Sequence, residues 1–389
     1  MEKRLFNKIL SRVQHGGLAV TYWDGETHKF GNEKPYFHLH IKNPAAIRAI
    51  LKNMSLGFGE SYAAGDIEVE GNLSDIGRLV AQNQAAFGGL GKLVRLAKLR
   101  KNTRGKQKGY IAHHYDLGNG FYKLWLDKSM TYSCAYYESP KDTLETAQQR
   151  KVGYILKKLQ LQPGQTLLDI GSGWGTLLIT AAKKYGVRGL GVTLSEEQLA
   201  HSKKAAKEAG VHKHVSFELV NYQELPKRKA TFDRIVSVGM FEHVGQGNHA
   251  QYYKAVDRLL KPSGVSVLHT ITQQTEEPND PWIDTYIFPG GYLPSNREIT
   301  AALPNYNFRL TDYENLRIHY AMTLEEWQRR FQLHRAKVIH MFDERFFRMW
   351  DLWLASSAAG FRYGNLDLSQ YVFTKGPQNN APLTRDYLY

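Results

Sequence analysis

Residues 166–186, "TLLDIGSGWGTLLITAAKKYG", constrain the fold more than any other stretch of the chain. They begin as an apolar run typical of a buried strand, turn through Gly171, Gly173 and Gly175, and continue with helical spacing. "RGLGVTLSEEQLAHSKKAAKEAG" repeats the pattern, with Ser195 placed to cap its helix. The strand-like runs "HVSFELV", "FDRIVSVG" and "VSVLHTIT" follow. This alternation predicts an α/β fold with a doubly wound, mostly parallel, Rossmann-like sheet that binds its ligand at the carboxyl ends of the strands.

The residues around the glycine turn indicate which ligand the sheet binds. A glycine-rich turn alone is a weak signal, because it also serves as a plain tight turn and occurs in nicotinamide and flavin folds. Here Asp169 stands two residues before Gly171, a form typical of enzymes that use S-adenosylmethionine, and the dinucleotide spacing G-x-G-x-x-G is absent. After the second predicted strand, where most such folds place an acid for the ribose, Thr193 and Gln198 offer neutral hydrogen bonds.

The length of 389 residues predicts two units, because single hydrophobic cores stop growing near about 250 to 300 residues. Residues 1–100 indicate a smaller N-terminal α/β domain, with the strand-like runs "GGLAVTYWDGE" and "YFHLHIKN". This part shows no metal-ligand spacing and no catalytic constellation, so we expect a lipid-binding or assembly role and no metal. We expect a basic linker at residues 101–109 and a catalytic domain at residues 110–389, with a helical insertion for a lipid tunnel.

The net charge of +14 favours a polyanionic partner, either a nucleic acid or an anionic lipid surface. The run at residues 92–108, "KLVRLAKLRKNTRGKQK", has no acid, and its first half interleaves cations with leucines and a valine. Two interpretations stay open for this run: a helix that lies in a headgroup interface, or a solvated interdomain linker. The single cysteine, the absence of a signal-like N-terminus and the absence of a long apolar run favour a cytoplasmic protein that spans no membrane.

Several motifs resemble, in matching order, the cyclopropane-fatty-acyl-phospholipid synthases: "HHYDLGNGFYKLWLD", "MTYSCAYY", "LLDIGSGWG", "GVTLSEEQ", "VGMFEHVG", "LHTIT" and "YIFPGGYLPS". The resemblance covers about residues 105–375, and "FGESYAAGDIEVEGNL" is similar to the N-terminal domain of the bacterial synthases. It implies a class I methyltransferase fold that transfers a methylene unit from S-adenosylmethionine to a cis double bond of a phospholipid acyl chain. The carbocation formed on the chain loses a proton to bound bicarbonate.

The resemblance also implies a homodimer at the inner face of an anionic membrane and no nucleic-acid partner. A nucleic-acid methyltransferase needs polar groups that read a flipped base, and the N/D-P-P-Y/F motif of amino-methylating enzymes does not occur. Three other readings stay open: a methyl-branching fatty acyl methyltransferase, a small-molecule methyltransferase on the same fold, and a non-catalytic lipid carrier.

The site residues implied by the resemblance fall into three groups. Catalytic residues that hold bicarbonate are Cys134, Glu242, His269 and Tyr320. Residues that bind the cofactor are Tyr132, Gly171, Gly173, Thr193, Leu194, Gln198, Asn221, Tyr222 and Gly239. Residues that bind the acyl chain are Tyr286, Phe288, Trp327 and Phe331.

For each group a structural role is the alternative. Cys134 is either a bicarbonate ligand, a core cysteine or a nucleophile, and the sequence around it has no adjacent histidine to activate a nucleophile. Without the motif match, the sequence favours structural roles for three of these residues. Glu242 would be an acid at the start of a helix, His269 a core histidine and Tyr320 a packing residue. Aromatic residues at helical spacing, such as those around Trp327, are usually core.

Overall fold

The computed structural model describes residues 1–91, 117–379 and 381–389, and the side chains of residues 88–91 are not described. The basic run at residues 92–108 and the predicted linker at residues 101–109 therefore lie outside the described residues. The described chain forms two compact units. One comprises residues 1–91, Asn279–Pro289 and Ala321–Asn365, and the other comprises residues 117–278, Gly290–Tyr320 and the chain from Leu366.

The second unit is built on a seven-stranded sheet with the order β10-β11-β9-β8-β5-β6-β7. The strands β9, β8, β5, β6 and β7 run parallel, whereas β10 and β11 add an antiparallel edge. The bounds are β5 Thr166–Ile170, β6 Arg188–Thr193, β7 Val215–Leu219, β8 Phe232–Val238, β9 Leu260–Gln273, β10 Phe308–Asn315 and β11 Leu366–Lys375. The predicted doubly wound α/β fold is confirmed. The antiparallel pairing of β11 with β9 and β10 was not predicted.

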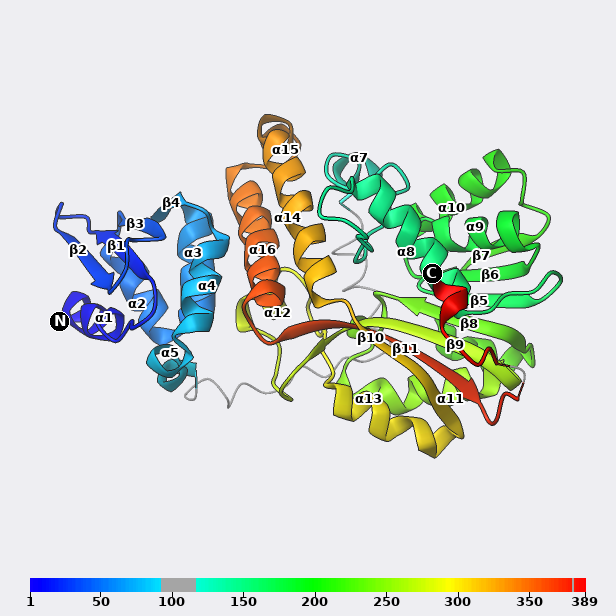
Figure 1. The fold of residues 1–389 in the computed structure, drawn as a ribbon. Helices are drawn as coiled ribbons and strands as arrows, with labels where there is room; N and C mark the ends of the chain where they lie inside the picture. The colour runs from blue at the N-terminus through cyan, green and yellow to red at the C-terminus, as the bar shows by residue number, and fades with distance from the viewer. Residues whose placement is uncertain (92–116, 380) are drawn as a thin grey trace. The chain divides into compact units, whose positions relative to one another are not determined.

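Helices cover both faces of this sheet. Figure 1 shows α8 (Leu144–Lys158), α9 (Thr176–Tyr185) and α10 (Glu196–Glu208) on one face, and α11 (His249–Leu259) and α13 (Asn296–Ala302) on the other. Each face has its own apolar core, one containing Leu178 and Val236 and the other Ile235 and Tyr252. The connections carry the helix α7 (Asn119–Tyr122) and the short 3-10 turns η2 (Tyr222–Arg228), η3 (Phe241–His243), η4 (Gln246–Asn248) and η5 (Leu303–Tyr306). A last 3-10 turn, η6 (Asp386–Leu388), follows β11.

The first unit joins the N-terminal segment to helices from far along the chain. Its four-stranded sheet has the order β2-β1-β3-β4, with β1 Gly17–Thr21, β2 Thr27–Gly31, β3 Phe37–Ile41 and β4 Ile67–Gly71. Its first helices are α1 Glu2–Leu10, α2 Pro44–Lys52, α3 Met54–Ala64, α4 Ser74–Gln82 and α5 Gln84–Gly91. The later helices are α12 Pro281–Tyr286, α15 Arg335–Met341, α16 Glu344–Arg362 and most of α14 Arg317–Leu333.

Close packing explains why the later helices group with the N-terminal segment rather than with the predicted catalytic domain at residues 110–389. A Cβ atom at Gly77 of α4 would lie 2.5 Å from the Cβ of Ala359 of α16, so the two helices touch at small residues. Arg348 of α16 also pairs with Glu68 of β4 at 2.9 Å. The first unit therefore contains more of the chain than the predicted residues 1–100, because the helical insertion packs with the N-terminal sheet.

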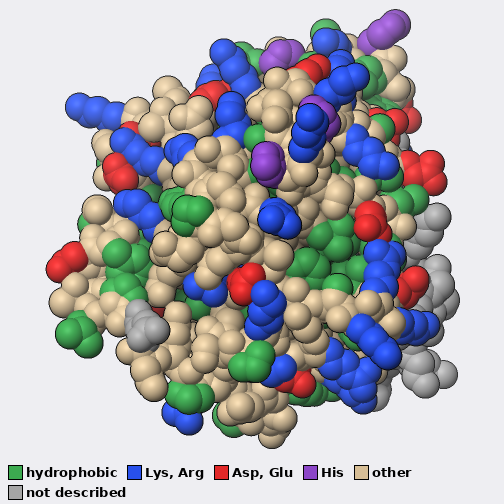
Figure 2. All heavy atoms as spheres, turned by 90° about the vertical axis from the view of Figure 1, so that its right-hand side faces the viewer, with side chains coloured by type: hydrophobic (Ala, Val, Ile, Leu, Met, Phe, Trp, Pro, Cys, Tyr) green, Lys and Arg blue, Asp and Glu red, His purple; other side chains and the backbone are tan. Residues whose placement is uncertain are grey.

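Among the described residues, none of the helices combines the length and the apolar character that a membrane span requires. On the face that Figure 2 shows, Lys and Arg side chains lie among acidic and apolar ones.

Candidate active site

A cavity of about 140 Å³ opens at the carboxyl ends of β5, β6 and β8 in the second unit. All the residues predicted to bind a cofactor line it: Tyr132, Gly171, Gly173, Thr193, Leu194, Gln198, Asn221, Tyr222 and Gly239. Eight of them lie at or just after the ends of β5, β6, β7 and β8, which the parallel topology brings to the same edge of the sheet, and Tyr132 comes from the segment before α8.

The glycine turn after β5 shapes the floor of this cavity. Gly171 and Gly173 have positive φ values of 84° and 54°, which side chains rarely adopt. A Cβ atom at Gly171 would lie 2.7 Å from the Cβ of Met240, so this position also needs glycine for space. At Gly173 a Cβ atom would meet no atom within 4 Å, which leaves the backbone open toward the cavity. Gly175 then caps α9 in the left-handed conformation.

Thr193 and Gln198 form one hydrogen-bonded unit at the end of β6. The Thr193 hydroxyl donates to Oε1 of Gln198 at 2.7 Å, and both side chains are buried. Ser195 caps α10 through its hydroxyl, which accepts from the Gln198 backbone N–H at 3.3 Å. The predicted cap is therefore confirmed, and the Gln198 amide nitrogen remains as a donor for a ligand.

A buried lysine, which the sequence did not single out, also lines the cavity. Lys151 of α8 donates to the Ser133 hydroxyl at 2.8 Å. Burial lowers the pKa of Lys151 to about 8, an effect that the nearby Cys134, Asp127 and Asp169 oppose. Lys151 lies four residues from the buried Ala147 and four from the buried Ile155, which places it on the apolar face of α8. A cation on an apolar helix face is the feature of the sequence that could have identified this residue.

Asp169 lies opposite Lys151 at the end of β5. It is almost completely buried, and burial raises the pKa of its carboxyl group to about 7, while the Lys151 cation counteracts the rise. Two buried ionisable groups thus line the cavity.

Glu242, predicted to be catalytic, lies in η3 directly after β8. Its Oε1 accepts a hydrogen bond from the backbone N–H of Ile271 at 2.7 Å, which fixes the carboxyl group beside β9. Its other oxygen, Oε2, is buried and has no hydrogen-bond partner among the described residues. Burial raises the pKa of Glu242 to about 7, although the hydrogen bond from the Ile271 N–H acts to lower it. A buried acceptor without a partner is costly and marks a place for a ligand.

His269, the second predicted catalytic residue, lies in β9 between Val238 of β8 and Gln370 of β11. Its Nδ1 is 3.0 Å from the Gln370 amide nitrogen, which donates to it and so leaves the ring proton on Nε2. That Nε2 is buried without a partner among the described residues. Burial, together with the Lys151 and Lys158 cations, holds the pKa of His269 well below its usual value. The ring is therefore a neutral donor, and Gln370 is a second residue that the sequence did not reveal.

Gly239 lies next to His269 and to the residue before Cys134. The Gly239 N–H donates to the His269 carbonyl at 2.9 Å, and a Cβ atom at Gly239 would lie 3.6 Å from the Ser133 Cβ. Cys134 follows Ser133, is fully buried, and its Sγ donates to the Ala135 carbonyl at 3.1 Å.

Tyr320, the fourth predicted catalytic residue, lies in the first turns of α14. Its N–H donates to the Leu316 carbonyl at 3.2 Å, and the Leu316 N–H donates to the Leu368 carbonyl of β11 at 2.7 Å. The start of α14 is thus anchored to the strand that carries Gln370. Tyr320 itself is half-buried.

The residues predicted to bind the acyl chain all lie in the first unit. Trp327 and Phe331 are fully buried in α14, and Phe331 stacks on Phe347 of α16 at 5.0 Å. Tyr286 donates through its hydroxyl to Glu60 at 2.6 Å, and Phe288 packs edge-on against Trp353. The packing of Phe331 fits the core role that stayed open in the sequence, and none of these four residues lines the cavity described above.

The sequence pattern of the mycolic acid cyclopropane synthetase family matches residues 102–371, and a domain family of unknown function matches residues 5–89. The chain is 39% identical to the cyclopropane-fatty-acyl-phospholipid synthase of Escherichia coli strain K12, over 98% of this chain and 96% of that protein. It is 35% identical to the tuberculostearic acid methyltransferase UfaA1 of Mycobacterium tuberculosis, over 95% of this chain and 91% of that protein.

Among solved structures, the mycolic acid cyclopropane synthase CmaA1, complexed with SAH and CTAB, superposes with a TM-score of 0.65 at 35% sequence identity. The match covers 69% of this chain and 98% of that structure.

Proposed function

Because the chain belongs to the mycolic acid cyclopropane synthetase family and is an S-adenosylmethionine-dependent methyltransferase, we propose that it cyclopropanates unsaturated acyl chains of membrane phospholipids. In this reaction a methylene unit adds across a cis double bond. Two buried polar atoms that have no hydrogen-bond partner in the described part of the chain, Oε2 of Glu242 and Nε2 of His269, carry the proposal, because an ordinary methyl transfer needs neither.

The cavity fits S-adenosylmethionine, which supplies an electrophilic methyl group when bound. Gly171 and Gly173 have positive φ values, which would strain a residue with a side chain. Because both positions lack a side chain, the backbone can approach a ligand closely. The Gln198 amide nitrogen and Asn221 are donors suited to hydroxyl and ring acceptors. Asp169 and Lys151 add a buried pair of ionisable groups at the cavity wall.

The pair Glu242 and His269 fits bicarbonate, which supplies a weak base when bound. The neutral His269 donates from Nε2, whereas the Glu242 carboxylate accepts at Oε2. Bicarbonate has both an oxygen that accepts and a hydroxyl that donates, so its chemistry matches both groups. Cys134 and Tyr320 complete the proposed set.

The protein's own part in the chemistry is positioning and exclusion of water. An alkene is a poor nucleophile, so the double bond must be held against the methyl group in a dry site. The carbocation that follows is stable only where water is absent, and Cys134, Glu242 and His269 are all buried. Loss of a proton from the transferred methyl group then closes the ring.

The proposed substrate is a phospholipid within a membrane, reached by a protein that binds the anionic inner surface peripherally and acts as a homodimer. The net charge of +14 supports electrostatic attraction to such a surface. Tyr286, Phe288, Trp327 and Phe331 are the proposed apolar contacts for the acyl chain.

A methyl-branched product is the second candidate. It is favoured by the 35% identity to a protein named as a tuberculostearic acid methyltransferase, which matches over nearly the full length of both chains. Both reactions begin with methyl transfer to an acyl double bond, and they differ in the fate of the carbocation.

Radiolabelled S-adenosylmethionine with vesicles of an unsaturated phosphatidylglycerol tests the proposal. We expect label in the lipid fraction, as a cyclopropane ring and not as a branch. Carbon dioxide-free buffer should lower the rate, and added bicarbonate should restore it. Absence of label from the lipid would contradict the proposed function, and a rate independent of bicarbonate would contradict the assigned base.

A further inference from the structure

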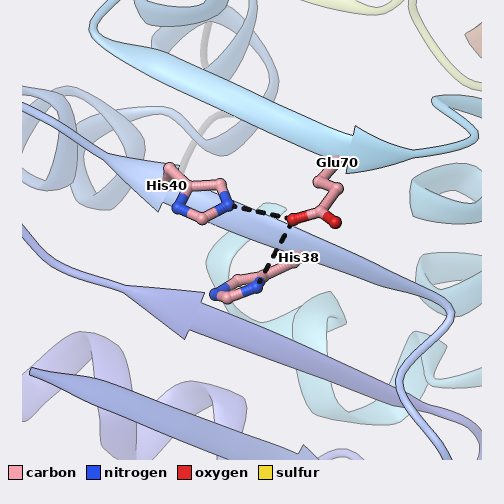
Figure 3. Close-up of side chains that lie close together, drawn as sticks. All are labelled: His38, His40 and Glu70. Atoms are coloured by element: carbon pink, nitrogen blue, oxygen red, sulfur yellow. Dashed lines mark hydrogen bonds and ion pairs between the residues drawn. The ribbon is translucent and has the colours of Figure 1, made fainter.

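Two histidines and one glutamate gather on one face of the N-terminal sheet, within the first unit. His38 and His40 lie two residues apart in β3, so their side chains point to the same face. Glu70 of β4 is the register partner of His38. Figure 3 shows the Glu70 carboxylate reaching both imidazole rings.

The distances among these side chains suit a shared ion. Oε2 of Glu70 lies 3.5 Å from Nε2 of His40 and 3.9 Å from Nδ1 of His38. One potential ligand atom from each residue falls within 4.8 Å of the others. Around a tetrahedral ion with bonds of about 2.1 Å, neighbouring ligand atoms lie about 3.4 Å apart. Small rotamer adjustments at an exposed carboxylate therefore close the site.

A hydroxyl group orients the first histidine. Nε2 of His38 lies 2.8 Å from the Thr21 hydroxyl, which in turn lies 2.7 Å from the Thr27 hydroxyl. Histidines that bind metals usually donate their other ring N–H to such a partner. With the proton on Nε2, the lone pair of Nδ1 faces Glu70.

In the described part of the chain, the charged side chains beside the cluster leave the Glu70 carboxylate without a Lys or Arg that would neutralise it. Glu68, two residues before Glu70, is neutralised by Lys42 at 3.1 Å and by Arg348 at 2.9 Å. Glu70 has no Lys or Arg partner among the described ion pairs.

We propose that His38, His40 and Glu70 bind one late first-row divalent metal ion, Zn²⁺ under cellular conditions. Imidazole nitrogens with a carboxylate suit Zn²⁺ better than Mg²⁺ or Ca²⁺, which prefer oxygen ligands. Water completes the coordination, because the site is open to solvent. The ion ties the edge strand β4 to β3 and stabilises the N-terminal sheet. We expected no metal here, since Glu70 is distant in sequence and only the strand register brings it to the histidines.

Metal titration of the full-length protein tests this site. Zn²⁺ is titrated in competition with a chromophoric chelator, and Co²⁺ absorption reports the coordination geometry. The wild type should bind one ion per chain and gain thermal stability. The double variant His38→Asn/His40→Asn should bind at least about 100-fold more weakly, and Glu70→Gln about tenfold more weakly.

The matched control is His28→Asn. His28 also lies in this sheet and pairs with a carboxylate, Glu26, at 2.6 Å, and it is 35% exposed against 36% for His40. This control should leave the affinity unchanged. Undiminished Zn²⁺ binding by the double variant, equal loss in the control, or no binding by the wild type would each overturn the proposal. Should the double variant not fold, the exposed single variant His40→Asn gives the same comparison.

Discussion

The Gln370 amide donates to Nδ1 of His269 at 3.0 Å, and this contact decides which ring nitrogen carries the proton. The two residues are direct register partners in β11 and β9. The antiparallel strand β11 therefore fixes the tautomer of a histidine on its neighbour β9.

Replacement of Gln370 by leucine should lower the rate about tenfold, because the imidazole then divides between two tautomers. Binding of S-adenosylmethionine should stay within about twofold, since Gln370 does not line the cofactor cavity. Steady-state kinetics and calorimetry measure the two effects. Gln378→Leu, at a peripheral amide pair with Gln160, is the control. Equal rates in both variants would show that Gln370 has no positioning role.

Replacement of Glu242 by glutamine should lower the rate by about 10² to 10⁴, because an acceptor for the proposed bicarbonate hydroxyl becomes an amide. The side chain keeps its size and its oxygen for the Ile271 N–H. Cofactor affinity should therefore change little. A variant with near wild-type rate would remove Glu242 from the proposed mechanism.

The same variant should also change how stability depends on pH. The pKa of Glu242 is raised to about 7 in the folded chain, so the folded state binds more protons than the unfolded state between about pH 4.5 and 7. Stability contributed by this group is highest in acid and falls as the pH rises through that window. Thermal unfolding should show Glu242→Gln more stable than the wild type at pH 8, with the gain vanishing near pH 4. A constant difference across this range would contradict the raised pKa.

Replacement of Lys151 by methionine should weaken binding of S-adenosylmethionine about tenfold and raise the pKa of Asp169 further, since the Lys151 cation lowers it. As the pH is lowered, the activity of this variant should begin to fall at a higher pH than the activity of the wild type. Lys157→Met is the control on the same helix, because Lys157 bonds the Leu388 carbonyl and does not line the cavity. Identical pH profiles for Lys151→Met and the wild type would count against this coupling.

Replacement of Cys134 by serine should retain activity within about tenfold, because the serine hydroxyl can replace the Sγ hydrogen bond to the Ala135 carbonyl. Rates on phospholipid vesicles and intact-protein mass spectrometry check this. Complete loss of activity in the serine variant, with a thioether adduct trapped on the wild type, would instead identify a nucleophile.

The sequence was most informative where local chemistry decides structure. The glycine turn after Asp169 needs positive φ values, and the Ser195 cap needs a hydroxyl, so both were readable from residue types alone. The sequence did not predict the roles of Lys151 and Gln370 or the proximity of His38 to Glu70. Each of these features depends on which strand or helix lies beside the residue. The placement of residues 321–365 in the first unit was likewise hidden, since it depends on small residues such as Gly77 and Ala359 that allow close packing.

Transfer from S-adenosylmethionine with a trideuterated methyl group tests the central claim most directly. Vesicles of unsaturated phospholipid are incubated with the protein, and the product acyl chains are analysed by mass spectrometry and nuclear magnetic resonance. We expect a cyclopropane ring whose methylene carbon keeps two of the three deuterium atoms, because one is removed when the ring closes. A branched methyl group that keeps all three deuterium atoms, or lipid without deuterium, would contradict it.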